Sequence, residues 1–421
     1  MHSIIIDKKM TLFEELKFRG FVNQCTDEKS LNQLIKKTRI HFYIGFDCTA
    51  QSLHVGSLIQ IMIMRLFQKY GHTPVVLIGK GTTKIGDPSG KDETRKMLGD
   101  DQISKNAKNL KKVFNKFLTF DSNNNKSVFR DNSTWLNKLN YVDFLRDYGK
   151  HFTINKMLSF DSVKLRLDRE QSLSFVEFNY MIFQAYDFYE LHNRDNCILQ
   201  IGGSDQWGNI VNGVDLIRRI KSKDSYGLTT PLLTNANGEK MGKTAEGAVW
   251  LDENFLTSYE YWQFWRNVDD RDVIKFIKLF TDLDTDVIKS IEKSKSNDIN
   301  KLKIILADET TLLLHGKEKA KKAKMTANEV FINKNVSGNL PSFTLNKDSF
   351  KEKILINELI VQMKLATSKS ESRKLIRGKG VKKNREIISN EMEEITLSEF
   401  SNANEILISV GKKKHFRVVL K

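Results

Sequence analysis

Apolar and polar positions near the N-terminus follow a pattern that predicts alternating strands and helices. A short apolar run that begins at Phe42 ends in a glycine-punctuated loop, and residues 58–70 then carry the apolar spacing of a helix. Residues 74–79 form a compact, β-branched run that predicts a second strand. Together these segments make one βαβ unit, and ligands bind where such loops leave the carboxyl ends of parallel strands. The pattern therefore predicts an α/β fold with a Rossmann-like parallel sheet.

The rest of the pattern divides the chain into three parts. Residues 97–170 and 246–345 are mainly helical in spacing, and an apolar strand pattern that begins at Cys197 runs into glycines and then into a helix at 209–220. An Asn-, Ser-, Gly- and Pro-rich stretch at 333–342 is typical of a linker. We expect a Rossmann-like catalytic domain over 1–235 with a helical insertion at about 97–195, a lysine loop and α-helical domain over 236–340, and a small α+β domain over 346–421.

Composition and charge narrow the class of protein. With 421 residues, of which 40% are hydrophobic and 10% aromatic, the chain can bury a sizeable core in two or three domains. The formal net charge of +16 indicates either a polyanionic partner or a basic, solvated surface. The three cysteines lack the paired spacing of metal ligands, and the N-terminus has no apolar signal core. We therefore expect a cytoplasmic protein with reduced thiols, no membrane span and no tightly bound metal.

The loop after the first strand holds the first candidate for chemistry. Residues 79–81 lack the third glycine of a dinucleotide fingerprint, and residues 86–91 are one position short of a P-loop. What remains is His54-Val-Gly56-Ser57 at the start of a predicted helix, where free N–H groups and the helix dipole favour a polyphosphate. Gly56 would allow close approach, and His54 could donate to a phosphate oxygen. The simpler alternative is a loop histidine bonded to backbone.

A second candidate is a polar face on a predicted helix. Tyr180, Gln184 and Asp187 have the spacing i, i+4, i+7, which places them on one helical face. Such a row is costly to bury without a ligand or internal partners, although a half-exposed polar face is the alternative. Tyr180 and Gln184 can accept from an ammonium, and Asp187, with Tyr43 from the first strand, can bond a phenolic hydroxyl. A site committed to bonding a hydroxyl rejects the analogue without it.

The segment after the strand that begins at Cys197 has the composition of a sugar-binding turn. Gly202 and Gly203 allow close approach of a ligand to the backbone, and Asp205 can accept from ribose hydroxyls. Gln206 adds a neutral polar contact next to them. A strand that runs into glycines and then into a helix is harder to dismiss as a chance turn than an isolated glycine pair.

Two loops supply cations. In the loop at residues 235–244, glycines predict mobility, so Lys240 and Lys243 can swing onto phosphates; a hairpin tip with solvated lysines is the alternative. Lys91 and Arg95 follow a Pro-Ser-Gly segment, which by itself is an ordinary turn with exposed charges.

These segments together resemble a known family. The stretch around His54 resembles the HIGH signature of class I aminoacyl-tRNA synthetases, and its surroundings are similar to tyrosyl-tRNA synthetase of the bacterial type. Lys240-Met-Gly-Lys-Thr244 corresponds to the KMSKS motif, whereas Ser57 replaces the usual second histidine and Cys48 stands where proline is common. The resemblance implies that tyrosine and ATP, which brings Mg²⁺, give tyrosyl-adenylate, and that the tyrosyl group then passes to tRNA. The run from 152 to 167 resembles a segment near the subunit interface, which implies a homodimer.

The resemblance also implies a role for each candidate residue. Tyr43 and Asp187 would bind the phenol, whereas Tyr180, Gln184 and Asp87 would hold the α-amino group, with Gln206 completing the tyrosine site. The residues implied to contact ATP are Gly45, Asp47, His54, Gly56, Ser57, Gly202, Asp205 and Lys243. Charge on the transferring phosphates would be stabilised by the implied catalytic residues His54, Lys240, Lys243, Thr244, Lys91, Arg95 and Thr49. Lys91 and Arg95 would lie on a mobile loop that meets the leaving pyrophosphate.

The C-terminal module has a basic character of its own. Residues 351–421 hold 16 Lys or Arg and 9 Asp or Glu, a balance of 16 − 9 = +7. The pattern predicts a helix, a second helix that Ser370 can cap, a glycine turn and a strand. This order resembles the αL RNA-binding motif, and it implies tRNA contacts; a solvated basic helix is the alternative. The cations that cluster on or beside the second helix are Lys369, Arg373, Lys374 and Arg377.

Two other functions fit parts of the pattern. A tryptophanyl-tRNA synthetase shares the fold class, but Tyr43 with Asp187 suits a phenol better than an indole. A non-catalytic RNA-binding protein on the same scaffold is suggested only by Ser57, and the lysine loop and the tyrosine pocket argue against it. Tyrosine-dependent exchange of labelled pyrophosphate into ATP separates the enzyme from the RNA-binding protein.

Overall fold

The computed structural model describes residues 10–89, 98–121, 125–244, 247–294, 298–331, 340–347, 350, 354–400, 404–411 and 414–421. These residues belong to two compact units. The first consists of Met1–Leu256 with Val268–Leu314, and the second of Thr257–Asn267 with His315–Lys421. The boundaries expected at residues 235 and 346 stay predictions, and Lys91 and Arg95 lie outside the described residues.

The first unit is built on a six-stranded sheet with the strand order β1-β6-β5-β2-β3-β4. Neighbouring strands pair in parallel, except that β1 runs antiparallel to β6. The predicted α/β class is therefore confirmed. The strand bounds are β1 Gln24–Cys25, β2 His41–Asp47, β3 Thr73–Gly79, β4 Val128–Asp131, β5 Cys197–Gly203 and β6 Tyr226–Thr230.

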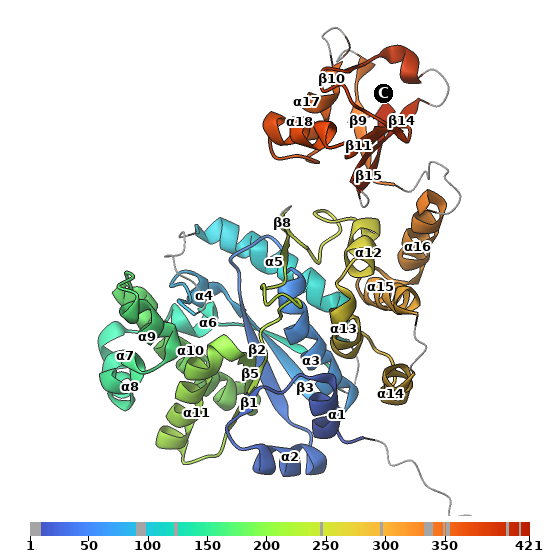
Figure 1. The fold of residues 1–421 in the computed structure, drawn as a ribbon. Helices are drawn as coiled ribbons and strands as arrows, with labels where there is room; N and C mark the ends of the chain where they lie inside the picture. The colour runs from blue at the N-terminus through green and yellow to red at the C-terminus, as the bar shows by residue number, and fades with distance from the viewer. Residues whose placement is uncertain are drawn as a thin grey trace, which may run out of the picture. The chain divides into compact units, whose positions relative to one another are not determined.

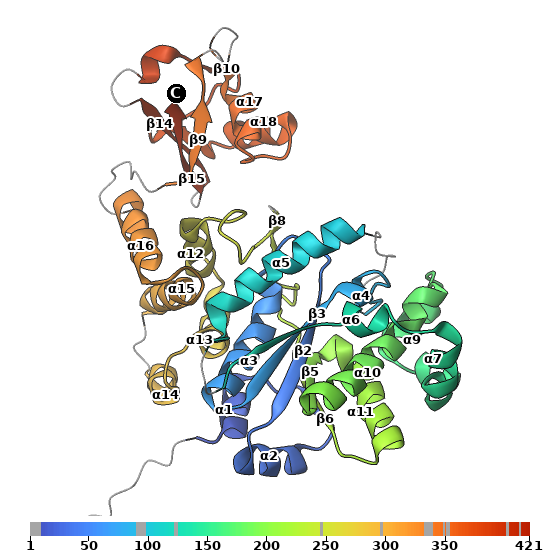
Figure 2. The same cartoon turned by 180° about the vertical axis from the view of Figure 1, so that it is seen from behind.

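Helices cover both faces of this sheet, as Figures 1 and 2 show. Helices α3 (Leu58–Lys69) and α5 (Asp100–Phe117) lie on one face, and α10 (Phe175–Asp195) and α11 (Trp207–Lys221) lie on the other. Because β3 is covered on both sides, its residues from Pro74 to Gly79 are all buried, which explains its continuous apolar run. The chain moves outward from β2 to β4 and then returns to place β5 beside β2. That reversal creates a crevice at the carboxyl ends of β2 and β5.

Short helices complete the first unit. Helices α1 and α2 precede β2, and Gly20 ends α1 in the left-handed conformation at φ 88°. Buried Arg19 bonds Glu15 and donates to the carbonyls of Lys278 and Leu283, which ties α1 to the end of α13. The bounds are α1 Leu12–Arg19, α2 Glu28–Lys37, α4 Lys80–Thr83, α6 Ser133–Leu136, α7 Tyr141–Asp147, α8 Ile154–Leu158, α9 Asp161–Asp168, α13 Val273–Phe280, α14 Thr285–Lys293 and α15 Ile299–His315. A two-stranded ribbon joins β7 (Lys243–Thr244) to β8 (Gly247–Ala248).

The second unit contains α12 (Ser258–Arg266), α16 (Lys317–Phe331) and a five-stranded sheet of order β12-β11-β14-β15-β9. Its helix α18 begins after Ser368, whose side chain accepts from the N–H of Glu371, so the cap expected at Ser370 lies two residues earlier. The remaining bounds are β9 Ser342–Leu345, β10 Ile354–Leu355, α17 Ile356–Gln362, α18 Lys369–Arg377, β11 Val381–Lys383, β12 Glu386–Ile387, β13 Glu394–Ile395, β14 Glu405–Val410 and β15 Lys414–Leu420. Among the described helices, none is both long and apolar enough to cross a bilayer.

Candidate active site

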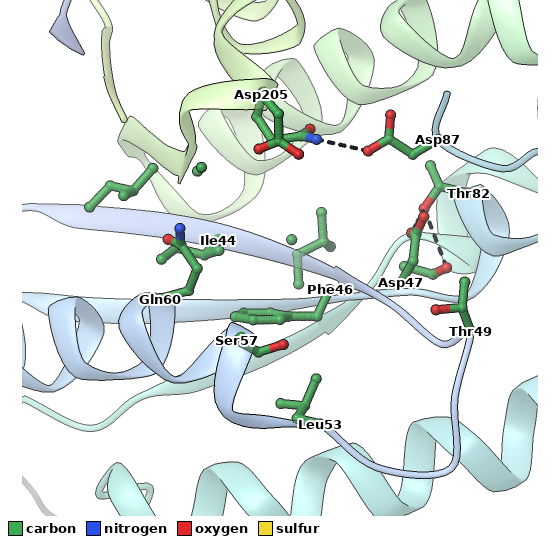
Figure 3. Close-up of a pocket in the computed structure, with 18 of the residues that line it drawn as sticks. Ile44, Phe46, Asp47, Thr49, Leu53, Ser57, Gln60, Thr82, Asp87 and Asp205 are labelled. Atoms are coloured by element: carbon green, nitrogen blue, oxygen red, sulfur yellow. Dashed lines mark hydrogen bonds between the residues drawn. The ribbon is translucent and has the colours of Figure 1, made fainter. Parts of the chain in front are cut away.

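A cavity of about 360 Å³ opens at the carboxyl ends of β2 and β5. Its walls come from these strands, from the loops that follow β2, β3 and β5, and from the inward face of α10. Figure 3 shows side chains from several of these segments turned toward one space. The cavity therefore lies at the edge of the sheet where a ligand site was predicted.

One end of the cavity holds Tyr43 and Asp187, both almost fully buried. The Asp187 carboxylate accepts from Trp135 Nε1 at 2.7 Å and from Asn132 Nδ2 at 2.9 Å, and these bonds fix its orientation. Burial raises the pKa of Asp187 to about 7, although the two hydrogen bonds lower it. The pKa of Tyr43 is raised well above its ordinary value by burial and then by the charge of Asp187. Within the described chain, the Tyr43 hydroxyl has no hydrogen-bond partner.

Beside this pair, Asp47 organises a second polar group. Its carboxylate accepts from the Tyr180 hydroxyl at 3.0 Å and from Thr82 Oγ1 at 2.7 Å. Figure 3 shows Asp47 and Thr82 turned toward each other across the end of β2. Because the Tyr180 hydroxyl donates to Asp47, its oxygen still has a lone pair that can accept from a cationic ligand.

A chain of amide side chains links α10 to the loop after β3. Asn209 Nδ2 donates to Gln184 Oε1 and to Gln206 Oε1, both at 3.1 Å. Gln206 Nε2 in turn donates to the Asp87 carboxylate at 2.8 Å. The chain orients the amides so that the oxygens of Gln184 and Asp87 are available as acceptors, which is the arrangement an ammonium group requires.

The loop that begins at His54 is held against the segment after the lysine loop. The Val55 N–H donates to the Val249 carbonyl at 2.9 Å, and His54 pairs with Trp250 in an antiparallel bridge. His54 Nδ1 accepts from the Gly56 N–H at 3.0 Å. A neutral imidazole that accepts at Nδ1 carries its proton on Nε2, so this ring is a hydrogen-bond donor at Nε2.

Gly242 of the lysine loop also packs against this region. Its backbone has φ +113°, and a Cβ there would lie 2.6 Å from His54 Nδ1 and 3.0 Å from the Gly56 nitrogen. Only glycine fits both the backbone conformation and the space. The two loops are therefore in direct contact through positions that have no side chain.

The pKa of Asp205, another carboxylate that lines the cavity, is affected by the lysine loop. Burial raises the pKa of Asp205, and the charge of Asp87 raises it further, whereas the charge of Lys240 lowers it. Lys240 thus acts electrostatically on the cavity, although it does not line it. Only the backbone is described for Lys243 and Thr244, in strand β7.

Comparison with known proteins identifies the family. Residues 36–332 match the family model described as tRNA synthetases class I (W and Y). Tyrosine–tRNA ligase of Pelagibacter ubique (strain HTCC1062) is 58% identical over 407 residues, which cover 97% of this chain and 98% of that protein. The ligase of Rickettsia prowazekii (strain Madrid E) is 52% identical over 409 residues, covering 97% of this chain and 100% of that protein. The chain belongs to the tyrosine–tRNA ligase family. Its activity is the ATP-dependent ligation of tyrosine to tRNA, as the resemblance implied.

Solved structures of tyrosyl-tRNA synthetases share the fold. A C-terminally truncated mitochondrial tyrosyl-tRNA synthetase of Aspergillus nidulans matches with a TM-score of 0.69 and 28% identity, covering 77% of this chain and 95% of that one. The tyrosyl-tRNA synthetase of Archaeoglobus fulgidus, crystallised with L-tyrosine, matches with a TM-score of 0.54 and 19% identity, covering 75% and 99%. At 19% identity, the match to the Archaeoglobus fulgidus structure supports the fold alone. The predicted class I catalytic fold is confirmed.

Most residues predicted for the ligase site come together in one place. Those that line the cavity are Tyr43, Gly45, Asp47, Thr49, His54, Gly56, Ser57, Asp87, Tyr180, Gln184, Asp187, Gly202, Asp205 and Gln206. The four predicted tRNA contacts lie on α18 in the second unit and are exposed. There Lys369 pairs with Glu358 and Arg377 with Glu391.

Sequence reasoning missed residues that hold the ligase site in shape. Asn132 donates to Asp187 and also to Thr82, and Thr82 bonds Asp47, so the two carboxylates share one network. Asn209 joins two predicted glutamines. No spacing connects Asn132 or Thr82 to α10, so only the paired strands reveal these contacts. No sequence pattern predicted the bond from Trp135 to Asp187.

Metal binding is decided by the donor set. Among the described residues, no group of three or more His, Cys, Asp or Glu side chains is placed to hold a metal ion. Gly56, Ser57 and His54 line the cavity together with the carboxylates of Asp47, Asp87, Asp187 and Asp205.

Proposed function

We propose that tyrosine lies in this cavity with its phenol between Tyr43 and Asp187 and its ammonium near Tyr180, Gln184 and Asp87. The observation that carries the proposal is the buried, unpartnered Tyr43 hydroxyl beside a carboxylate that two neighbours hold in place. Such a pair has hydrogen-bonding capacity for a ligand hydroxyl and none for a plain ring. At the other side, each acceptor keeps a lone pair for the ammonium.

We infer that ATP occupies the rest of the cavity, with its ribose at Asp205 and Gly202 and its phosphates toward His54. Gly45, Asp47, Gly56 and Ser57 line the same space, which supports their assignment to the nucleotide. The tyrosine carboxylate attacks the α-phosphorus in line, so the protein supplies position and charge stabilisation and needs no nucleophile of its own. Mg²⁺ bound to the phosphates would neutralise part of their charge. His54 Nε2, Thr49, Thr244 and the cations Lys240, Lys243, Lys91 and Arg95 would stabilise the charge that develops on the transferring and leaving phosphates.

The variant His54→Ala tests this mechanism in tyrosine-dependent pyrophosphate exchange. A hydrogen bond to a charged group is worth about 1.5–3 kcal/mol, which corresponds to a loss of about 10- to 150-fold in kcat. The KM for tyrosine is expected to change less than about threefold, because His54 faces the phosphates and not the amino acid. The matched control is His151→Ala, a histidine outside the cavity, with unchanged kcat. A variant that raised the KM for tyrosine while kcat stayed constant would contradict the assignment.

We propose that the α18 helix of the second unit contacts tRNA through Lys369, Arg373, Lys374 and Arg377. Its exposed cations and the +7 balance of the C-terminal residues support an RNA surface. Arg373 and Lys374 are the stronger candidates, because Lys369 and Arg377 are already paired with glutamates at the surface.

We infer that the ligase is a homodimer. Nine large apolar side chains between residues 141 and 176 are exposed in the described chain, among them Val142 at 70% and Phe175 at 67%. A concentration of apolar surface of this kind marks a protein interface. The expected mass in light scattering is twice 48.7 kDa, and Val142→Glu with Phe175→Glu should halve it. A wild-type monomer would refute the dimer and leave the catalytic proposal intact.

We propose a cytoplasmic location, because tRNA, ATP and tyrosine meet there during translation. The three cysteines are free thiols, and two of them are buried, which fits a reducing compartment.

A further inference from the structure

Helix α5 carries a stripe of exposed lysines that the catalytic proposal leaves without a role. Lys105, Lys108 and Lys112 are exposed and spaced i, i+3, i+7, so they share the outer face of the helix over about 10 Å. Lys111 and Lys116 add charge beside them. From residue 102 to residue 120 the sequence contains no Asp or Glu. The outer face of α5 is therefore a local positive surface.

These lysines differ from several cations of the first unit that form ion pairs. Lys80 bonds Asp131, Lys278 bonds Glu292, and Lys84 bonds Asp100 at the start of α5 itself. In the described chain, Lys105 and Lys108 have no acidic partner within ion-pair distance. Among the described residues, Lys112 has one polar contact, with the Asn109 amide oxygen at 3.4 Å. Within the described residues, no acidic side chain forms an ion pair with the three lysines of the stripe.

The inner face of the same helix forms part of the cavity wall. Leu110 lines the cavity, and Asn106 Nδ2 donates to the Cys48 carbonyl at 2.8 Å in the loop after β2. The Phe114 ring packs edge-on against Phe46, with centroids 4.7 Å apart. Because an α-helix with its side chains is about 10–12 Å wide, the lysine stripe lies about one helix diameter from the cavity wall that Leu110 forms.

We propose that the lysine stripe of α5, formed by Lys105, Lys108 and Lys112, holds the phosphate backbone of tRNA near its 3′ end. This inference rests on the proposed function, in which the tRNA terminal ribose must reach the tyrosyl-adenylate in the cavity. The strand that enters must cross an element that forms the rim, and α5 is one of them. The stripe offers regularly spaced ammonium groups and no exposed large apolar side chain, which suits a polyanion and provides no core for a protein interface.

The test compares two reactions in the full-length enzyme. The triple variant Lys105→Gln/Lys108→Gln/Lys112→Gln is assayed for aminoacylation of tRNA and for tyrosine-dependent pyrophosphate exchange, which needs no tRNA. The KM for tRNA is expected to rise several-fold, while exchange stays within about twofold. If the three lysines neutralise three phosphates, the log–log slope of kcat/KM for tRNA against salt should fall in magnitude by about 2 to 3.

Two further variants make the outcome decisive. Lys29→Gln/Lys36→Gln/Lys37→Gln removes the same charge from exposed positions of α2, which precedes the amino end of β2, and it should leave the KM for tRNA unchanged. Lys105→Arg/Lys108→Arg/Lys112→Arg keeps the charge on α5 and should retain the wild-type KM. If the α2 and α5 triple variants raised the KM for tRNA equally, net charge alone would explain the result, and the proposal would be overturned. Lost exchange with an unchanged KM for tRNA would overturn it as well, whereas absent exchange in the wild type would instead refute the proposed function.

Discussion

The buried hydroxyl of Tyr43 destabilises the ligand-free enzyme, because only a ligand can satisfy its hydrogen bonding. It is buried and makes no hydrogen bond within the described chain, and an unsatisfied buried hydroxyl costs about 1–3 kcal/mol. Tyr43→Phe is therefore expected to raise the unfolding free energy of the ligand-free enzyme by about 1 kcal/mol. The same change removes a bond to the substrate phenol, so the KM for tyrosine should rise about fivefold to tenfold. Chemical denaturation and exchange kinetics measure the two effects.

The control for this prediction is another tyrosine with a satisfied hydroxyl. Tyr186 donates to Glu190 at 2.8 Å and does not line the cavity, so Tyr186→Phe should lower stability and leave the KM for tyrosine unchanged. A destabilised Tyr43→Phe enzyme with normal tyrosine affinity would contradict the role of Tyr43.

Asp187 predicts a pH dependence for tyrosine binding. Burial raises its pKa to about 7, so without tyrosine the carboxyl takes up a proton as pH falls below that value. If the carboxylate accepts from the phenol, kcat/KM for tyrosine should fall below about pH 7 and approach a tenfold loss per pH unit. Asp187→Asn should lower kcat/KM at high pH and lose the bend near pH 7. A bend that survives in Asp187→Asn would assign the titration to another group.

The raised pKa of Asp187 also predicts how the stability of the free enzyme changes with pH. Because the folded pKa lies above the ordinary value, the charged form is disfavoured in the folded enzyme, and the cost grows as pH rises from about 4 to about 7. Asp187→Asn should therefore stabilise the free enzyme more at pH 8 than at pH 4.

Helical spacing predicted some residues of the active site and could not predict others. Tyr180, Gln184 and Asp187 share one helix face, which a period of 3.6 residues reveals directly. Asn132 and Thr82 approach Asp187 and Asp47 through pairing between strands and through short helices, and no local period encodes that meeting. Their chemistry is also shared by ordinary loop residues, so the sequence alone could not single them out.

At the scale of elements, the lysine loop contacts the loop that begins at His54 through Gly242. Gly242 has φ +113° and no room for a Cβ beside His54, so Gly242→Ala must move one loop. If this displaces the lysines from the phosphates at a cost of about 1–3 kcal/mol, kcat for exchange should fall about 5- to 150-fold. The KM for tyrosine should change little, since the tyrosine end of the cavity is built by other elements.

The same loop offers a matched control. Gly238 also has a positive φ, +83°, but a Cβ there meets nothing within 4 Å. Gly238→Ala thus carries the backbone strain without the clash, and its kcat should fall less than that of Gly242→Ala. Equal losses would show that strain alone, and not contact with the His54 loop, accounts for the effect.

Elements with strong periodicity were placed well by the sequence, and their ends were not. The predicted helix at 58–70 is α3, Leu58–Lys69, and the predicted strand at 74–79 is β3, Thr73–Gly79. Ser370 and Ser368 are equally good caps by residue type, and the choice falls to Ser368, whose side chain bonds the Glu371 N–H.

At the scale of the whole molecule, the proposed site of tyrosine activation and the proposed tRNA contacts on α18 lie in different parts of the chain. The cavity is formed by residues of the first compact unit, whereas the α18 cations belong to the second. The sequence signalled this division by its change to a basic character near the C-terminus. Compactness, however, groups α12 and α16 with the second unit, because long-range contacts that no local pattern encodes decide that grouping.

This separation predicts that changes in α18 affect one reaction and spare the other. Arg373→Gln/Lys374→Gln removes two exposed cations that, unlike Lys369 and Arg377, form no ion pair within the described residues. The KM for tRNA should rise about threefold to tenfold, and the log–log salt slope should fall in magnitude by about 1.4 to 1.8, because two phosphate contacts are lost. Pyrophosphate exchange should not change, since no residue of the cavity is altered. Lys347→Gln/Lys421→Gln removes equal charge outside α18 and is the control. If both pairs shifted the KM equally, the helix would be a solvated basic surface.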